Sequence, residues 1–122
     1  MLGHISFGVR DLKRSIGFYD AVLAPLGMVR VWSGEAAAGY GAAGGGDKLA
    51  LFERAAAHAP GPGFHLAFNA PDRAAVDAFH RAALAAGGRD NGAPGLRPHY
   101  SPTYYAAFAF DPDGHALEAV HQ

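Results

Sequence analysis

The chain has 122 residues, no cysteine, and a formal net charge of −1 with its 7 histidines neutral. Hydrophobic residues make up 50% and charged residues 17%, a composition typical of one compact domain with a sizeable core. The lack of cysteine excludes disulfides, thiolate metal sites and a cysteine nucleophile. Scattered basic residues give no reason to expect nucleic acid or an anionic membrane as a partner. No apolar run approaches a membrane span, and the N-terminus shows no export signal, so we expect a cytoplasmic protein.

The first half of the chain predicts a strand, a helix and two or three further strands. Residues 4–9 alternate between large apolar side chains and small or polar ones, which is typical of a strand with one buried face. Asp11 is a good N-cap for a helix that Pro25 and Gly27 end. Further strands are expected at residues 28–32 and 48–52, and a weak one near Tyr40 within the Gly- and Ala-rich residues 33–47.

The second half predicts the same order of elements. Residues 65–70 alternate again, Asp72 caps a helix, and Gly87 with Gly88 stops it. A turn-rich stretch, residues 89–103, comes next. Strands are then expected at residues 104–110 and 115–120, joined by the Asp-Pro-Asp-Gly turn of residues 111–114.

A shift of 61 residues, half the chain, superimposes the two halves without a gap and places His4 on His65. Two copies of so long a repeat indicate two similar supersecondary units rather than a solenoid. The matched pairs include Ile5 with Leu66, Phe7 with Phe68, Asp11 with Asp72, Phe18 with Phe79, and Gly27 with Gly88. We therefore predict one α+β domain, residues 1–122, with module one at about 1–54, a linker at 55–63 and module two at about 64–122. We expect its strands to form an open, cupped and barrel-like mixed sheet with the helices outside.

Two histidines and one glutamate are the candidate chemical groups. His4 and His65 lie on the strand faces that carry small residues, so both are expected to face the cup. Glu118 lies within an apolar strand, where a carboxylate is costly to bury unless it is paired or bound to a metal. Two imidazoles and a carboxylate form a common metal-binding set. The alternatives are backbone-bonded histidines and a glutamate at a sheet edge that faces water or pairs with an arginine.

The remaining histidines have no partner in the repeat. His58, in the linker, and His80, opposite Phe79 on its helix, are expected to be solvated. His99, His115 and His121 are possible neighbours of a metal site rather than its ligands.

The chain resembles the vicinal oxygen chelate superfamily, which comprises the glyoxalase, bleomycin-resistance and extradiol dioxygenase proteins. The resemblance spans nearly the whole chain and is specific for the fold more than for the reaction. It rests on the residues around His4 and Asp11, Ser15–Asp20, Leu26–Gly27, His65–Phe68, Tyr104–Tyr105, Asp111–Gly114 and Leu117–Val120.

This resemblance implies two βαβββ modules around a divalent metal ion (Zn, Fe, Mn or Ni), with His4, His65 and Glu118 as ligands. Glyoxalase-like members add an acid on the last strand of module one, where this chain has Ala50 or Leu51. Glu53 is the nearest acid, but it is out of register. The chain thus fits the three-ligand pattern of the dioxygenase-like and fosfomycin-resistance-like members.

Two functions follow from these predictions. The first is a metal-dependent lyase, isomerase or dioxygenase that acts on a small substrate with adjacent oxygens, with Tyr105 orienting the substrate or passing a proton. The second is a metal-free protein that binds a small molecule, as bleomycin-resistance members do. Fosfomycin-type thiol transfer is a weaker branch, because no cluster of basic residues offers a phosphonate clamp. Aromatic residues near the cup could line a pocket, although core packing is preferred for Phe108. A homodimer is expected, and residues 87–103 form either a lid or a plain surface connection.

Overall fold

The computed structural model describes all 122 residues as two successive strand–helix–strand units. The first unit contains β1 (Ile5–Val9), α1 (Leu12–Leu23) with a 3-10 turn η1 (Ala24–Leu26), β2 (Val29–Ser33), β3 (Ala37–Gly41) and β4 (Leu49–Glu53). The second contains β5 (Leu66–Asn69), α2 (Arg73–Ala85), β6 (Arg89–Leu96), β7 (Tyr105–Phe110) and β8 (Ala116–His121). Each unit follows the order βαβββ, as the internal repeat predicts. Neither helix has the length and apolar character needed to span a membrane.

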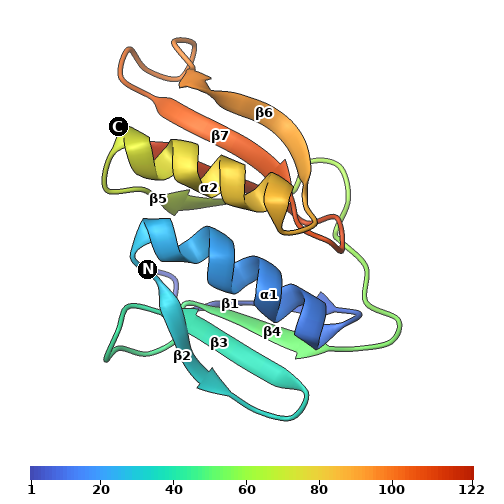
Figure 1. The fold of residues 1–122 in the computed structure, drawn as a ribbon. Coiled ribbons are helices and arrows are strands. Elements are labelled where there is room, and N and C mark those ends of the chain that lie inside the picture. The colour runs from blue at the N-terminus through green and yellow to red at the C-terminus, as the bar shows by residue number, and fades with distance from the viewer.

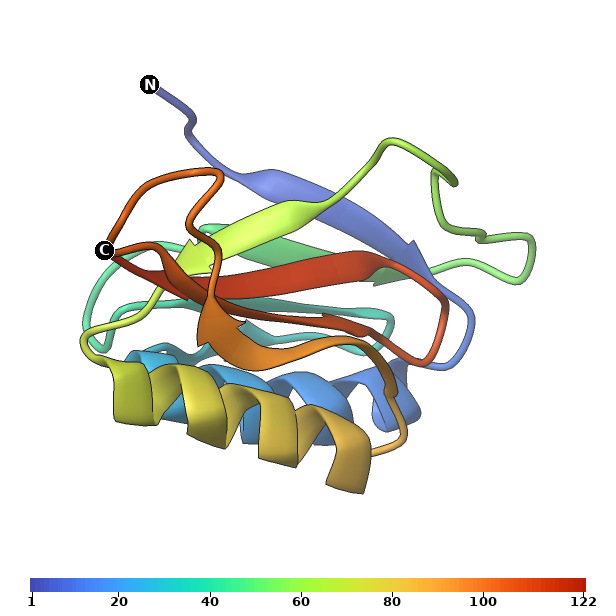
Figure 2. The ribbon, with the colours of Figure 1, turned by 90° about the horizontal axis from the view of Figure 1, so that it is seen from above.

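The two units form two four-stranded mixed sheets of identical topology. Their strand orders are β1-β4-β3-β2 and β5-β8-β7-β6, with the first pair of each sheet parallel and the others antiparallel. The sheets are not closed into a barrel. Both helices lie on the same side of the sheets and pack against each other (Figures 1 and 2). Each sheet therefore has one face covered by helices and one face turned away from them, which we call the open face.

Both helices begin and end where the sequence predicts. The carboxylates of Asp11 and Asp72 accept hydrogen bonds from the third backbone amide of their helices, at 3.1 and 2.8 Å, and so satisfy donors that have no partner within the helix. Gly27 after η1 and Gly87 after α2 take positive φ values of 81° and 99°, which L side chains rarely adopt.

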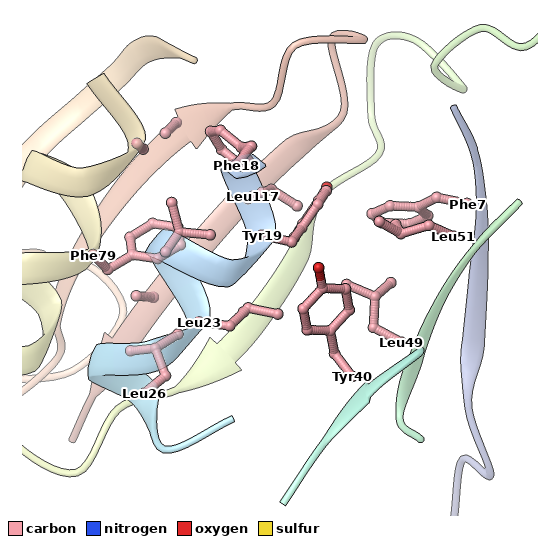
Figure 3. Packing of buried hydrophobic residues seen from close by; sticks show 14 of the residues in the cluster. Phe7, Phe18, Tyr19, Leu23, Leu26, Tyr40, Leu49, Leu51, Phe79 and Leu117 are labelled. Atoms are coloured by element: carbon pink, nitrogen blue, oxygen red, sulfur yellow. The ribbon is translucent and has the colours of Figure 1, made fainter. Parts of the chain in front are cut away.

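The core lies between the helices and the covered faces of both sheets. Phe18 from α1 and Phe79 from α2 are fully buried. Gly88 permits this packing, because a Cβ there would lie 2.7 Å from the Phe18 ring. The two modules thus share one continuous core. Figure 3 shows its largest members: Phe7, Phe18, Tyr19, Leu23, Leu26, Tyr40, Leu49, Leu51, Phe79 and Leu117.

The turn between β7 and β8 fastens module two onto the start of α1. The buried carboxylate of Asp113 accepts hydrogen bonds from the backbone amide of Arg10 and the guanidinium of Arg14, both at 3.1 Å. The buried carboxylate of Asp111 accepts from the Tyr19 hydroxyl at 2.6 Å and pairs with Nδ1 of His115 at 2.8 Å. Arg10, Arg14 and Tyr19 precede these aspartates by about a hundred positions in the chain, whereas the Asp111–His115 pair lies within the turn itself.

Two local predictions are wrong. The sequence pattern places residues 89–96 in a turn-rich stretch, but they form the strand β6. The Gly and Pro residues of this strand do not prevent its pairing with β7, which shifts register at two places. His80 is 9% exposed rather than solvated, and its Nε2 pairs with the Asp90 carboxylate at 2.8 Å. Asp90 lies on β6, which packs along α2. The position of His80 on α2 therefore could not reveal its partner, because that partner belongs to a different element.

We predict that Asp111→Ala lowers the free energy of unfolding by about 3 kcal/mol. The substitution leaves the Tyr19 hydroxyl and His115 without their buried partner, and each such group costs about 1–3 kcal/mol. Chemical denaturation at neutral pH measures the change. Glu35→Ala removes an exposed carboxylate that forms no ion pair and serves as the control. Equal stabilities of the two variants would contradict the role given to Asp111.

The stability difference between the wild type and Asp111→Ala should also depend on pH. Burial alone would raise the pKa of Asp111, but hydrogen bonds from His115 and Tyr19 outweigh it and bring the pKa below the ordinary value of 3.8. A carboxyl whose pKa is lowered by folding stabilises the protein above its ordinary pKa and loses this effect as the pH falls through the lowered value. The difference should be constant near neutral pH and shrink below about pH 4.

Candidate functional site

Glu118 lies near the middle of β8 and points to the open face of the second sheet. Its strand neighbours Leu117 and Ala119 belong to the core, so alternation directs Glu118 away from the helices. In the sheet register it lies between Ala67 of β5 and Phe108 of β7. The residue is nevertheless only 1% exposed. A carboxylate buried this deeply requires partners.

Both oxygens of the Glu118 carboxylate have a partner. Oε1 lies 3.0 Å from Nε2 of His65, whose side chain is about half exposed. Oε2 accepts a hydrogen bond from the Tyr104 hydroxyl. Burial and this hydrogen bond to a carboxylate raise the pKa of Tyr104 to about 12, so the phenol remains a neutral donor at physiological pH. The result is an imidazole, a carboxylate and a phenol in direct contact.

Aromatic and basic side chains surround this group. The rings of His65 and Phe108 lie 6.2 Å apart, and the Arg97 guanidinium lies 5.3 Å from the centre of the Phe108 ring. Tyr100 packs against Tyr104 with 5.0 Å between ring centres. Phe108 therefore belongs to the open face, and the expectation that it packs in the core is wrong.

Tyr105 occupies the opposite face of the same strand. Its hydroxyl donates to the Asp77 carboxylate on α2 at 2.7 Å, and this hydrogen bond raises its pKa. Tyr104, one residue earlier, contacts Glu118 instead. Of the two tyrosines, Tyr104 is therefore the one beside the candidate site. The alternation rule separates the two residues correctly but does not say which face carries Glu118.

His4 does not join His65 and Glu118 within one chain. It lies exposed just before β1 and lines a cavity between β1 and β5, and no three acidic or histidine side chains of the chain come close enough to hold a metal ion. The remaining histidines do not contact Glu118 either. His115 pairs with Asp111, His121 bonds to the carbonyl of Ala70, and His99 packs on Tyr100.

The register of the sheets identifies the position in module one that corresponds to Glu118. Ala67 pairs with Glu118, and its repeat partner Ser6 pairs with Ala50. Leu51 points into the core and is fully buried. The Glu53 carboxylate accepts a hydrogen bond from the backbone amide of Leu12 at 2.8 Å and so binds the first turn of α1. Position 50 thus holds an alanine where a fourth ligand would lie.

Trp32 is an aromatic residue on the open face of module one that the sequence pattern does not reveal. Arg30 and Trp32 pair with consecutive residues of β3 across a β-bulge, which turns the indole onto the open face. There it lies directly on Gly39, since a Cβ at Gly39 would be 2.1 Å from the indole Nε1. Trp32 remains 38% exposed, so it forms an accessible aromatic surface on β2, at the opposite edge of the sheet from Ser6 on β1.

Two βαβββ modules in tandem are the fold of the vicinal oxygen chelate proteins, and comparison with known proteins supports this assignment. A model of the Glyoxalase/Bleomycin resistance protein/Dioxygenase superfamily matches residues 1–119. The structure of a glyoxalase/bleomycin resistance protein from Albidiferax ferrireducens is similar with a TM-score of 0.88 and 32% identity, covering 100% of this chain and 99% of that chain. Comparison with curated protein sequences gives no match.

Two further structures share the fold at lower identity. A glyoxalase-related enzyme from Fulvimarina pelagi has a TM-score of 0.77 and 24% identity over 100% of this chain and 88% of that chain. A glyoxalase I mutant from Zea mays has a TM-score of 0.75 and 24% identity over 96% of this chain and 44% of that chain. The chain belongs to the Glyoxalase/Bleomycin resistance protein/Dioxygenase superfamily.

We predict that Gly39→Ala displaces the Trp32 indole into water. The added methyl group occupies the space of the indole nitrogen, and such overpacking costs about 1–3 kcal/mol. Trp32 is the only tryptophan of the chain, so its greater exposure to water should move the fluorescence emission maximum to longer wavelength.

Gly17→Ala is the matched control for this substitution. On the exposed side of α1, no atom other than those of its chain neighbours and the surrounding helix backbone lies within 4 Å of the added methyl group. It should leave the fluorescence unchanged and raise stability by about 0.5–1 kcal/mol, because alanine favours a helix over glycine. An unchanged emission maximum in Gly39→Ala would contradict the placement of the indole.

Proposed function

We propose that the protein is a divalent-metal-dependent enzyme that acts on a small substrate with two adjacent oxygens, as a lyase, isomerase or dioxygenase. The contact between His65 and the buried Glu118 carries this proposal. Imidazole nitrogen and carboxylate oxygen are two donor types of the two-histidine, one-carboxylate set, and here they lie 3.0 Å apart on an open sheet face. The donor chemistry therefore fits a divalent ion.

His4 completes the proposed ligand set from a second copy of the chain. One chain leaves His4 apart from His65 and Glu118, and each of its two sheets has a face that the helices do not cover (Figure 2). A homodimer that places module one of one chain against module two of its partner would bring the three ligands together. Each dimer would then hold two equivalent sites.

The chemistry that such an ion supplies is Lewis-acid stabilisation of negative charge on the adjacent substrate oxygens. Tyr104, whose pKa is raised by burial and by Glu118, stays protonated; its proton is donated to Glu118, and its hydroxyl oxygen can accept a hydrogen bond from the substrate. Phe108, and Trp32 from the facing module, form apolar walls that exclude water and orient the substrate.

A specific observation also favours metal-free binding of a small molecule. The Glu118 carboxylate is already satisfied by His65 and Tyr104, so its burial does not require a metal ion. In that case the polar group serves as a recognition site for the ligand. The proteins similar to this chain are described both as glyoxalase and as bleomycin resistance protein.

Metal content distinguishes these two functions. We expect about one Zn, Fe, Mn or Ni ion per chain after purification without chelators, and loss of that ion in His65→Ala and Glu118→Ala. His58→Ala, which removes an exposed linker histidine, is the control and should retain the metal. Full metal content in either ligand variant would contradict the proposed set, and a metal-free wild type that does not take up these ions would favour the binding protein.

Mixing two variants that each lack one metal ligand tests whether a second copy of the chain contributes to the site. His4→Ala and Glu118→Ala each lack one ligand at every shared site. In a mixed dimer one site loses both ligands and the other is intact, so refolding the two variants together should restore one metal ion per mixed dimer. No recovery in confirmed mixed dimers would show that the ligands do not come from two chains.

A further inference from the structure

The cavity that His4 lines lies between the two modules, and of the three proposed metal ligands it contains His4 alone. It has a volume of about 460 Å³, within the range of small-molecule sites, and it opens where the edge strands β1 and β5 approach each other near the end of η1. None of His65, Tyr104 and Glu118 lines it. Its walls are mainly apolar and come from both modules, including Ile5, Leu26, Met28, Leu66 and Phe68.

The polar groups of this cavity are basic or neutral. Lys48 is its single charged side chain, His4 and Asn69 are the other polar ones, and no carboxylate lines it. Lys48 is exposed and forms no ion pair with any acidic residue. An apolar cavity with one unpaired ammonium group is complementary to a ligand with an apolar body and one negative charge.

We propose that this cavity binds a small amphiphilic carboxylate, with its hydrocarbon body against Leu66 and Phe68 and its carboxylate at Lys48. The apolar walls supply affinity in proportion to the hydrocarbon area removed from water. The ammonium group of Lys48 selects an anion over a neutral compound of the same length. Because both modules line the cavity, the bound ligand also joins β1 to β5. The proposal does not rest on metal binding at Glu118.

Calorimetric titration with straight-chain carboxylates from butanoate to decanoate tests the apolar wall. Affinity should rise by about fourfold per methylene group until the chain fills the cavity. 1-Octanol should bind about two- to fivefold more weakly than octanoate, because it lacks the charge that the exposed Lys48 recognises. Affinity that is independent of chain length, or equal for octanol and octanoate, would overturn the proposal.

Two pairs of variants locate the octanoate site. Lys48→Glu should weaken octanoate binding by tenfold or more, while Lys13→Glu, which changes another exposed lysine, on α1, should not. Ala42→Phe should block the cavity, while Ala43→Phe, at the adjacent exposed position that does not line it, should leave binding intact. Circular dichroism and thermal unfolding establish that each variant is folded.

The outcomes separate the cavity from the Glu118 group. Loss of binding in Lys48→Glu and Ala42→Phe, with normal binding in Glu118→Ala, supports the proposal. Binding that survives both cavity substitutions, or that fails only in Glu118→Ala, overturns it. The proposal would also be overturned if octanoate did not bind and Lys48→Glu caused a dimer to dissociate. In that case the cavity would be a contact between copies of the chain.

Discussion

The placement of module two on α1 depends on two buried carboxylates in a single turn. Asp111 joins Tyr19 of the first module to His115 of the second, and Asp113 binds the backbone of Arg10 and the side chain of Arg14. A buried charge is tolerated only with complete hydrogen bonding, so the turn fits in one position and orientation. Phe7 of β1 stacks on the His115 ring with 4.3 Å between centres, which continues this junction into the shared core. The relative position of the two open faces follows from it.

The buried carboxylate of Glu118, unlike those of Asp111 and Asp113, does not join the two modules. Its partners His65 and Tyr104 lie on the open face of module two, and His65 remains half exposed. The same sheet position in module one holds Ala50, with Ser6 and Gly39 on the adjoining strands and Trp32 beyond them. One module therefore offers polar donors and the other an apolar surface with an aromatic wall. The two otherwise equivalent modules therefore differ in the side chains of their open faces.

The alternating strands, the capping residues Asp11 and Asp72, and the half-chain repeat were sufficient to predict the βαβββ order and the α+β class. They fail where partners come from distant strands. Alternation cannot tell that Tyr104 shares a face with Glu118, because β7 and β8 both carry apolar residues on each side and only their register decides. His80 likewise finds its partner Asp90 on β6, a segment whose composition suggests a loop.

The sequence by itself determined the local structure and the kinds of chemical group, since caps, turn residues and strand alternation act over a few residues. It also placed His4 and His65 at equivalent positions of a repeat. Only the tertiary structure decided which of these groups meet. The shared core packs α1 against α2 and sets the two sheets side by side, so His65 reaches Glu118 while His4 lies at a separate cavity between the modules. Which groups meet depends on packing between elements far apart in the chain, and no local pattern encodes those distances.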